Sequence, residues 1–331
     1  MIVEPLKIMF VDIPKTGSSA MKRFLYRSYN SFGITGVTNS NWLQNLCPNT
    51  VKFAGGKLIS RSPRHEPLIS RFVNLSSLKD YFVFTVVRDP FTRFRSAVLE
   101  ILVHNSFGIK GHSLDNNSSP HNKEYYPDSW VLPNINGKEE NVNTDIIDKQ
   151  WILFLDKFTI IKNKGGFGNY DLCSVPLHFW PQHYFTDLTS PTPVKIYTIK
   201  YEHLKDEFFR LKEELSYFSG VDVSDVELEY ANPTAEQTFG YFNPSAVDTI
   251  CKDLPTEALE TFLNNNFPSP DFVKKYPTFT DFLPVFDEKV NQIKEYVYPK
   301  IEEHRSLIEK LYEKDYMMFG YEQQMLNMVI S

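Results

Sequence analysis

Short apolar runs alternate with amphipathic stretches along the first third of the chain. Residues 6–11 and 81–87 are almost wholly apolar and rich in strand formers, which is typical of strands buried on both faces. Each run is followed by a short polar loop and then by apolar side chains at helical spacing, in residues 18–29 and 90–101. This repeated order of strand, loop and helix predicts an α/β fold with a central parallel sheet flanked by helices.

The rest of the chain gives weaker signals. Residues 194–199 predict a further strand, residues 51–54 a weaker one, and residues 301–312 a late helix that begins after Pro299. Residues 104–143 are crowded with Asn, Ser, Gly, Pro and His, so we expect a long surface excursion, either a substrate lid or a plain solvated insertion. Residues 264–284 look similarly irregular. We expect one domain over residues 1–331.

Composition excludes several classes of protein. With 331 residues and 42% hydrophobic content, the chain can bury a sizeable core, which rules out a disordered chain, a collagen or a coiled coil. Its 35 basic and 41 acidic residues give a net charge of -6, so no global basic field attracts nucleic acid or anionic lipid, and any anion site is built locally. The three cysteines are widely separated, which is typical of reduced thiols and not of a disulfide framework. No run approaches the roughly 20 apolar residues of a membrane helix, so we expect no membrane span and a cytoplasmic location.

The loop after the first predicted strand is the first candidate site. It reads Ile-Pro-Lys-Thr-Gly-Ser-Ser over residues 13–19, so backbone amides, a helix N-terminus, hydroxyls and the Lys15 ammonium would converge on a phosphate-like anion. It is not a Walker A loop, because there the lysine follows the second glycine, whereas Lys15 precedes Gly17. The same residues also fit an ordinary turn at Gly17 with Ser18 as a helix cap.

The second candidate follows the predicted strand at residues 81–87. Arg88 stands where this strand ends, which is the usual edge for ligands in a parallel α/β sheet. Ser96 lies eight residues further on, about two turns inside the next predicted helix, so both side chains could reach one anion. Alternatively, Arg88 pairs with Asp89 or caps a helix.

Together these segments resemble the nucleotide-binding signatures of sulfotransferases that use 3′-phosphoadenosine 5′-phosphosulfate (PAPS). The similarity is greatest to the Golgi-type carbohydrate sulfotransferases, which include heparan sulfate 2-O- and chondroitin 4-O-sulfotransferases. Three later segments extend it: residues 178–182 are similar to the family's His-Trp-x-Pro-Gln, residues 200–204 to its Tyr-Glu-x-Leu, and residues 311–321 to its closing Tyr-x-x-Asp-Phe-x-x-Phe-Gly-Tyr. The resemblance implies a P-loop-like sulfotransferase fold, PAPS as donor, 3′-phosphoadenosine 5′-phosphate (PAP) as product, and no required metal.

The resemblance also implies roles for individual residues. A lysine beside the leaving oxygen stabilises charge that develops in the transition state, and this is the role implied for Lys15. The fork-shaped guanidinium of an arginine suits a phosphate that takes no part in the reaction. Carried over by position, Lys15, Thr16, Gly17, Ser18 and Ser19 would hold the 5′-phosphosulfate, and Arg88 with Ser96 the 3′-phosphate.

The acceptor hydroxyl must lose a proton as it attacks, so a general base is required. His65 is the leading candidate, because it stands in the segment before the Arg88 strand where relatives place a histidine base. It is also compatible with an ordinary surface histidine. Glu66, His178 and His183 are the alternatives, and for His178 a packed core position is equally in keeping with the sequence.

The sequence departs from the Golgi relatives in its acidic balance of charge, and we expect no membrane anchor of the kind that those relatives carry. A neutral or lightly charged acceptor is therefore expected, either a glycan or another hydroxylated small molecule. Two other functions stay open: a divergent P-loop kinase, against which the missing Walker A spacing counts, and a non-catalytic glycan-binding relative.

Overall fold

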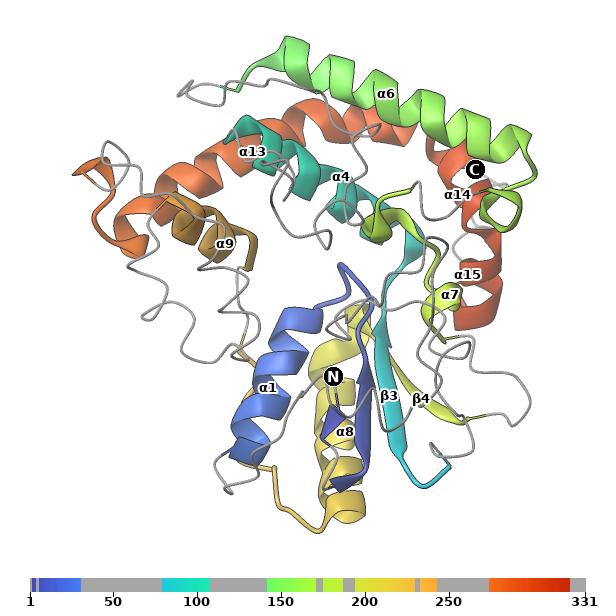
Figure 1. The fold of residues 1–331 in the computed structure, drawn as a ribbon, viewed down its shortest axis with the longest axis vertical. Coiled ribbons are helices and arrows are strands. Elements are labelled where there is room, and N and C mark those ends of the chain that lie inside the picture. Colours follow the sequence, from blue (N-terminus) through green and yellow to red (C-terminus); the bar gives the residue numbers. More distant parts are fainter. Residues whose placement is uncertain are drawn as a thin grey trace, which may run out of the picture. The chain divides into compact units, whose positions relative to one another are not determined.

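The computed structural model describes eight stretches of the chain, in two compact units (Figure 1). Unit 1 comprises Met1–Asp89, Pro181–Ala231 and Lys314–Ser331, and unit 2 comprises Pro90–Trp180 and Asn232–Glu313. The expectation of one domain over residues 1–331 stays a prediction. The described residues are 2–3, 6–30, 79–107, 142–170, 175–186, 194–229, 233–242 and 274–321.

A four-stranded sheet with the order β1-β2-β3-β4 forms the centre of unit 1. Strands β2, β3 and β4 are parallel, with Phe10 beside Phe84 and Val87 beside Lys200, so the predicted α/β fold with a parallel sheet is confirmed. The first strand, which the sequence pattern did not predict, pairs antiparallel with β2. The predicted strand at residues 51–54 lies outside the described residues. The strands span β1 (Ile2–Val3), β2 (Ile8–Val11), β3 (Phe82–Val87) and β4 (Ile196–Lys200).

Two helices, α1 (Ser18–Asn30) and α8 (Leu204–Ser219), pack together against one face of this sheet. Phe24 of α1 meets Phe208 of α8 edge to face, with ring centroids 4.7 Å apart. Both helices bury apolar side chains against Phe10 and Phe84, which alternate along their strands with residues buried on the other face. Burial on both faces explains why β2 and β3 read as continuous apolar runs. The shorter elements of unit 1 are α7 (His183–Thr186), η8 (Tyr201–His203) and all but the first residue of α15 (Glu313–Phe319).

Among its described residues, unit 2 is helical and is held together by aromatic packing. The Phe94 ring meets the rings of Phe158 and Phe179, with centroids 5.0 Å and 5.5 Å apart. Buried aromatic pairs of this geometry add to the stabilisation that comes from the burial of apolar area. The helices are α4 (Pro90–Ser106), α6 (Thr144–Asn163), η5 (Phe167–Asn169), η7 (Leu177–Phe179), α9 (Pro233–Phe242), α13 (Phe279–Glu303) and α14 (Arg305–Leu311).

Three expectations about helix boundaries are wrong. The late helix does not begin after Pro299, because α13 continues through this proline and ends at Glu303; His304 then separates it from α14, which begins at Arg305. The first helix begins at Ser18, so Gly17 and not a serine takes the N-cap position, and its carbonyl accepts from the Met21 N–H at 3.2 Å. Residues 104–106 of the expected excursion continue α4, while residues 108–141 lie outside the described part.

The start of α13 also corrects the irregular segment expected at residues 264–284. Thr278 caps this helix through a reciprocal hydrogen-bond pair with Asp281, so the chain is helical from Phe279 onward.

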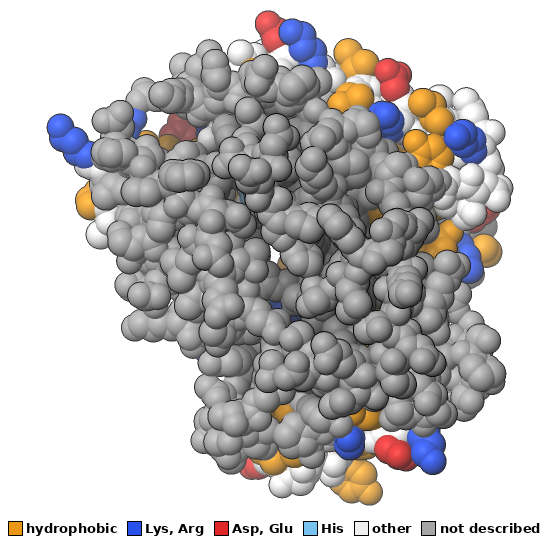
Figure 2. All heavy atoms as spheres, in the orientation of Figure 1, with side chains coloured by type: hydrophobic (Ala, Val, Ile, Leu, Met, Phe, Trp, Pro, Cys, Tyr) orange, Lys and Arg blue, Asp and Glu red, His pale blue; other side chains and the backbone are white. Residues whose placement is uncertain are grey.

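Where described residues are visible at the rim of one face, charges of both signs are mixed. On the face drawn in Figure 2, lysine and arginine side chains are interspersed with acidic and hydrophobic ones. None of the helices in the described part combines the length and the apolarity that a membrane span requires.

Candidate functional site

The loop between β2 and α1 has an unusual backbone. Both Lys15 and Gly17 have positive φ values, 68° and 84°. Such residues in a short loop bend the backbone so that successive N–H groups face one side, a geometry typical of anion-binding loops. The Thr16 side chain is fully buried, and its hydroxyl donates to the Ile13 carbonyl at 2.9 Å, so it holds the loop together. Lys15 is half-buried.

Asp12 and Lys22 fix the base of this loop. The Lys22 ammonium donates to Asp12 Oδ2 at 2.8 Å, and the Asp12 carboxylate is buried. This ion pair ties the end of β2 to the first turns of α1.

Tyr201 lies against the loop, directly after β4. A Cβ added to Gly17 would stand 3.0 Å from Tyr201 Cε2, so any larger residue here would require the Tyr201 ring to move. The carboxyl ends of β2, β3 and β4 lead into the Lys15 loop, Arg88 and Tyr201, and parallel strands bring these ends to one edge of the sheet.

The Arg88 side chain bridges these three segments. Its Nη1 donates to the Lys15 carbonyl at 3.2 Å, and its guanidinium lies 4.6 Å from the centre of the Tyr201 ring. No carboxylate among the described residues forms an ion pair with this guanidinium. The half-buried positive charge therefore lies beside the loop in a position to attract an anion.

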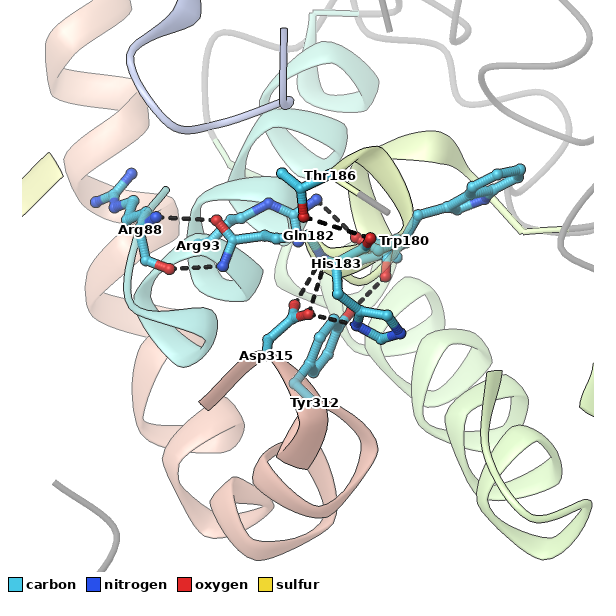
Figure 3. A network of polar contacts seen from close by, with 9 residues as sticks. Arg88, Arg93, Trp180, Gln182, His183, Thr186, Tyr312 and Asp315 are labelled. Atoms are coloured by element: carbon cyan, nitrogen blue, oxygen red, sulfur yellow. Dashed lines mark hydrogen bonds and ion pairs between the residues drawn. The ribbon is translucent and has the colours of Figure 1, made fainter. Parts of the chain in front are cut away.

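The backbone of Arg88 is held by Gln182 (Figure 3). The Arg88 N–H donates to Gln182 Oε1 at 2.9 Å, and Gln182 Nε2 donates to the Arg88 carbonyl at 2.7 Å. The Gln182 N–H donates in turn to Asp315 Oδ2 at 2.7 Å, while the His183 N–H and ring contact Asp315 Oδ1 at 2.9 Å and 2.6 Å. Gln182 and Asp315 are fully buried.

A similar arrangement holds Asp89, the next residue. Its N–H donates to Glu202 Oε1 at 2.8 Å, and the Tyr321 hydroxyl donates to Glu202 Oε2 at 2.7 Å. Burial, followed by the hydrogen bond to Glu202, raises the pKa of Tyr321 above its ordinary range. Tyr321 therefore stays protonated and keeps donating to this carboxylate at physiological pH.

The other predicted site residues are not brought together with Arg88 by the described part of unit 1. Ser96 is half-buried on α4 in unit 2, whereas Arg88 belongs to unit 1, so their shared phosphate stays a prediction. His65 and Glu66 lie outside the described residues. His183, an alternative base, is buried and bonded to Asp315.

His178, the remaining alternative base, lies in unit 2 and pairs through Nε2 with Glu100 at 3.2 Å. The backbone of the same segment is held by Arg93 of α4, which is fully buried and donates to the carbonyls of His178 and Trp180 at 3.2 Å and 2.8 Å (Figure 3). The indole of Trp180 donates to the Val175 carbonyl at 2.9 Å. These contacts give Arg93 and Trp180 a structural role in this segment.

Five residues that hold Arg88 and Asp89 have no role predicted from the sequence. All five lie in the three later segments that resemble the sulfotransferases. That resemblance is the one feature of the sequence that could have pointed to them. They are Gln182, Tyr201, Glu202, Asp315 and Tyr321.

Comparison with known proteins gives one match. The model described as "Sulfotransferase family" matches residues 1–250 of the 331, which include the loop, Arg88, Gln182 and Glu202. No curated protein and no solved structure matches the chain. In the described part, no three His, Cys, Asp or Glu side chains gather as a metal site would require.

Proposed function

This chain belongs to the sulfotransferase family, and we propose that it transfers a sulfuryl group from PAPS to a hydroxyl of a carbohydrate. The observation that carries the proposal is the Arg88 guanidinium beside the Lys15 loop, with no carboxylate pairing with it among the described residues. Two basic side chains at the carboxyl edge of a parallel sheet are well placed to bind a nucleotide with several anionic groups.

The residues of the loop fit the 5′-phosphosulfate. Positive φ values at Lys15 and Gly17 support a concave set of backbone N–H groups, and α1 adds the positive end of its dipole at Ser18 and Ser19. Because the Thr16 hydroxyl already donates to Ile13, Thr16 would contribute its backbone N–H. Arg88, together with Ser96, would bind the 3′-phosphate.

The proposed reaction is one in-line displacement at sulfur. A bond forms between the acceptor oxygen and sulfur while the bond from sulfur to the 5′-phosphate oxygen breaks, which leaves PAP. The proton of the acceptor hydroxyl passes to a general base, for which His65 is our candidate. The Lys15 ammonium stabilises the charge that develops on the leaving oxygen.

Calorimetric titration with PAP, ADP and ATP-Mg tests the donor assignment. The wild type should bind PAP in preference to ADP, because only PAP carries a 3′-phosphate, and Arg88→Ala should weaken PAP binding about tenfold or more. Lys205→Ala, which removes an exposed positive charge on α8, is the control. Preference for ATP-Mg would favour a kinase instead.

Turnover tests the role of Lys15. PAP release from PAPS, measured with a panel of saccharide acceptors, should fall about 10²–10³-fold in Lys15→Ala, because the lysine acts mainly in the transition state. PAP affinity should fall much less. Unchanged turnover in this variant would remove the catalytic assignment, and the absence of turnover with any acceptor would favour a non-catalytic glycan-binding protein.

A further inference from the structure

The carboxyl-terminal segment of unit 1 contributes buried contacts near Arg88, although it lies beyond residue 250, where the family match ends. Asp315 accepts hydrogen bonds from the backbone N–H groups of Gln182 and His183 and contacts the His183 ring. Its carboxylate is fully buried, so it bonds to Gln182 and His183 and not to solvent.

Gln182, which Asp315 holds, also binds the backbone of Arg88 through its side chain. The Gln182 amide forms hydrogen bonds with both the N–H and the carbonyl of Arg88, across 94 positions of sequence. Neither backbone group can turn without the loss of one bond. When the N–H and the carbonyl of a residue are both fixed, the direction of its Cα–Cβ bond is fixed as well, and the side chain starts from a set position.

The direction of Arg88 matters because its guanidinium lies between the Lys15 carbonyl and the Tyr201 ring. A rotation about the Arg88 backbone would move the guanidinium out of both contacts. Binding of a phosphate by arginine depends on the alignment of its N–H groups, so a misaligned guanidinium loses affinity while its charge remains.

We propose that Gln182 is a positioning residue of the donor site: anchored by Asp315, it aligns Arg88 with the 3′-phosphate of the nucleotide. This inference rests on the proposed function of Arg88. Gln182 itself acts through the Arg88 backbone.

Paired titrations with PAP and adenosine 5′-monophosphate (AMP) test this role, because the two nucleotides differ only in the 3′-phosphate. In Gln182→Ala, the ratio of PAP to AMP affinity should fall about tenfold, while AMP affinity changes less than about twofold. The double variant Arg88→Ala/Gln182→Ala should have the ratio of Arg88→Ala alone, because Gln182 acts only through Arg88. Asp315→Asn should lower the ratio in the same direction, since its amide nitrogen would face one of the two backbone N–H groups.

Thr85→Val is the matched control. It removes a buried hydrogen bond of 2.8 Å, from the Thr85 hydroxyl to the Val11 carbonyl, in the same unit and within β3, the strand that Arg88 follows. It should lower thermal stability and leave the affinity ratio unchanged. If Gln182→Ala does not unfold cooperatively, Gln182→Glu replaces it, because Glu keeps the acceptor for the Arg88 N–H and turns an oxygen toward the Arg88 carbonyl.

The outcomes separate the two proposals. An unchanged ratio in Gln182→Ala, equal losses for PAP and AMP, or additive losses in the double variant would overturn the positioning role and leave the donor assignment in place. A wild type that binds PAP and AMP equally would overturn the donor assignment itself, and the positioning role with it.

Discussion

Both the backbone conformation at Gly17 and the space around it favour glycine. Its φ of 84° lies in the left-handed region, where side chains with a Cβ are strained. In addition, a Cβ at this position would stand 3.0 Å from the Tyr201 ring, which also lies against the Arg88 guanidinium. Pushing the ring away would therefore disturb both parts of the candidate donor site.

Gly17→Ala should therefore lower the free energy of unfolding more than the replacement of a glycine that has a positive φ but open space around it. Gly220 provides the comparison, because its φ is 69° and no atom lies within 4 Å of an added Cβ. We expect a loss of about 1 kcal/mol for Gly220→Ala from backbone strain and about 2–4 kcal/mol for Gly17→Ala once overpacking is added. Urea denaturation measures both, and equal losses in the two variants would show that the Tyr201 contact carries no cost.

At this scale, the sequence revealed residues whose own chemistry is distinctive. Lys15 and Arg88 could be proposed because a basic residue directly after a buried strand is uncommon and is well placed to bind an anion. Gln182 could not be found in this way, since its partner is a backbone group 94 positions distant, and such a bond leaves no local pattern. His65 illustrates the opposite case: its chemistry suggested a base, but its position is outside the described residues.

At the scale of elements, the strength of the apolar pattern decided what could be predicted. Strands β2 and β3 were evident because both faces are buried, which makes the run continuous. The two residues of β1 are too few to show any period. The parallel order of β2, β3 and β4 then explains why three loops far apart in sequence meet at one edge of the sheet.

Helix α13 shows why a local signal can fail. Pro299 lies inside it, although a proline in a helix interior costs about 3 kcal/mol. The helix buries Ile293, Val297 and Ile301 at intervals of four residues, so the same face is covered on both sides of the proline. Burial of this apolar face offsets the free-energy cost of the proline. A prediction based on Pro299 alone does not include this stabilisation by tertiary packing.

At the scale of the whole molecule, neither compact unit is a continuous piece of sequence. Unit 1 is made from three segments and unit 2 from two. The family match ends at residue 250, yet unit 1 uses Asp315 and Tyr321 to hold Gln182 and Glu202, and unit 2 includes α13 and α14. Residues of the candidate site that lie inside the matched region therefore depend on hydrogen bonds from residues outside it.

Truncation tests this dependence. A chain of residues 1–250 should fail to unfold cooperatively and should not bind PAP, because Gln182 and His183 lose the buried acceptor Asp315, and Glu202 loses the Tyr321 hydroxyl. A chain of residues 1–321 keeps both anchors and should bind PAP, as calorimetry and thermal unfolding would show. If residues 1–250 bound PAP as tightly as the full chain, the carboxyl-terminal contacts would be dispensable for the donor site, and the alignment of Arg88 would have to come from the first two segments of unit 1 alone.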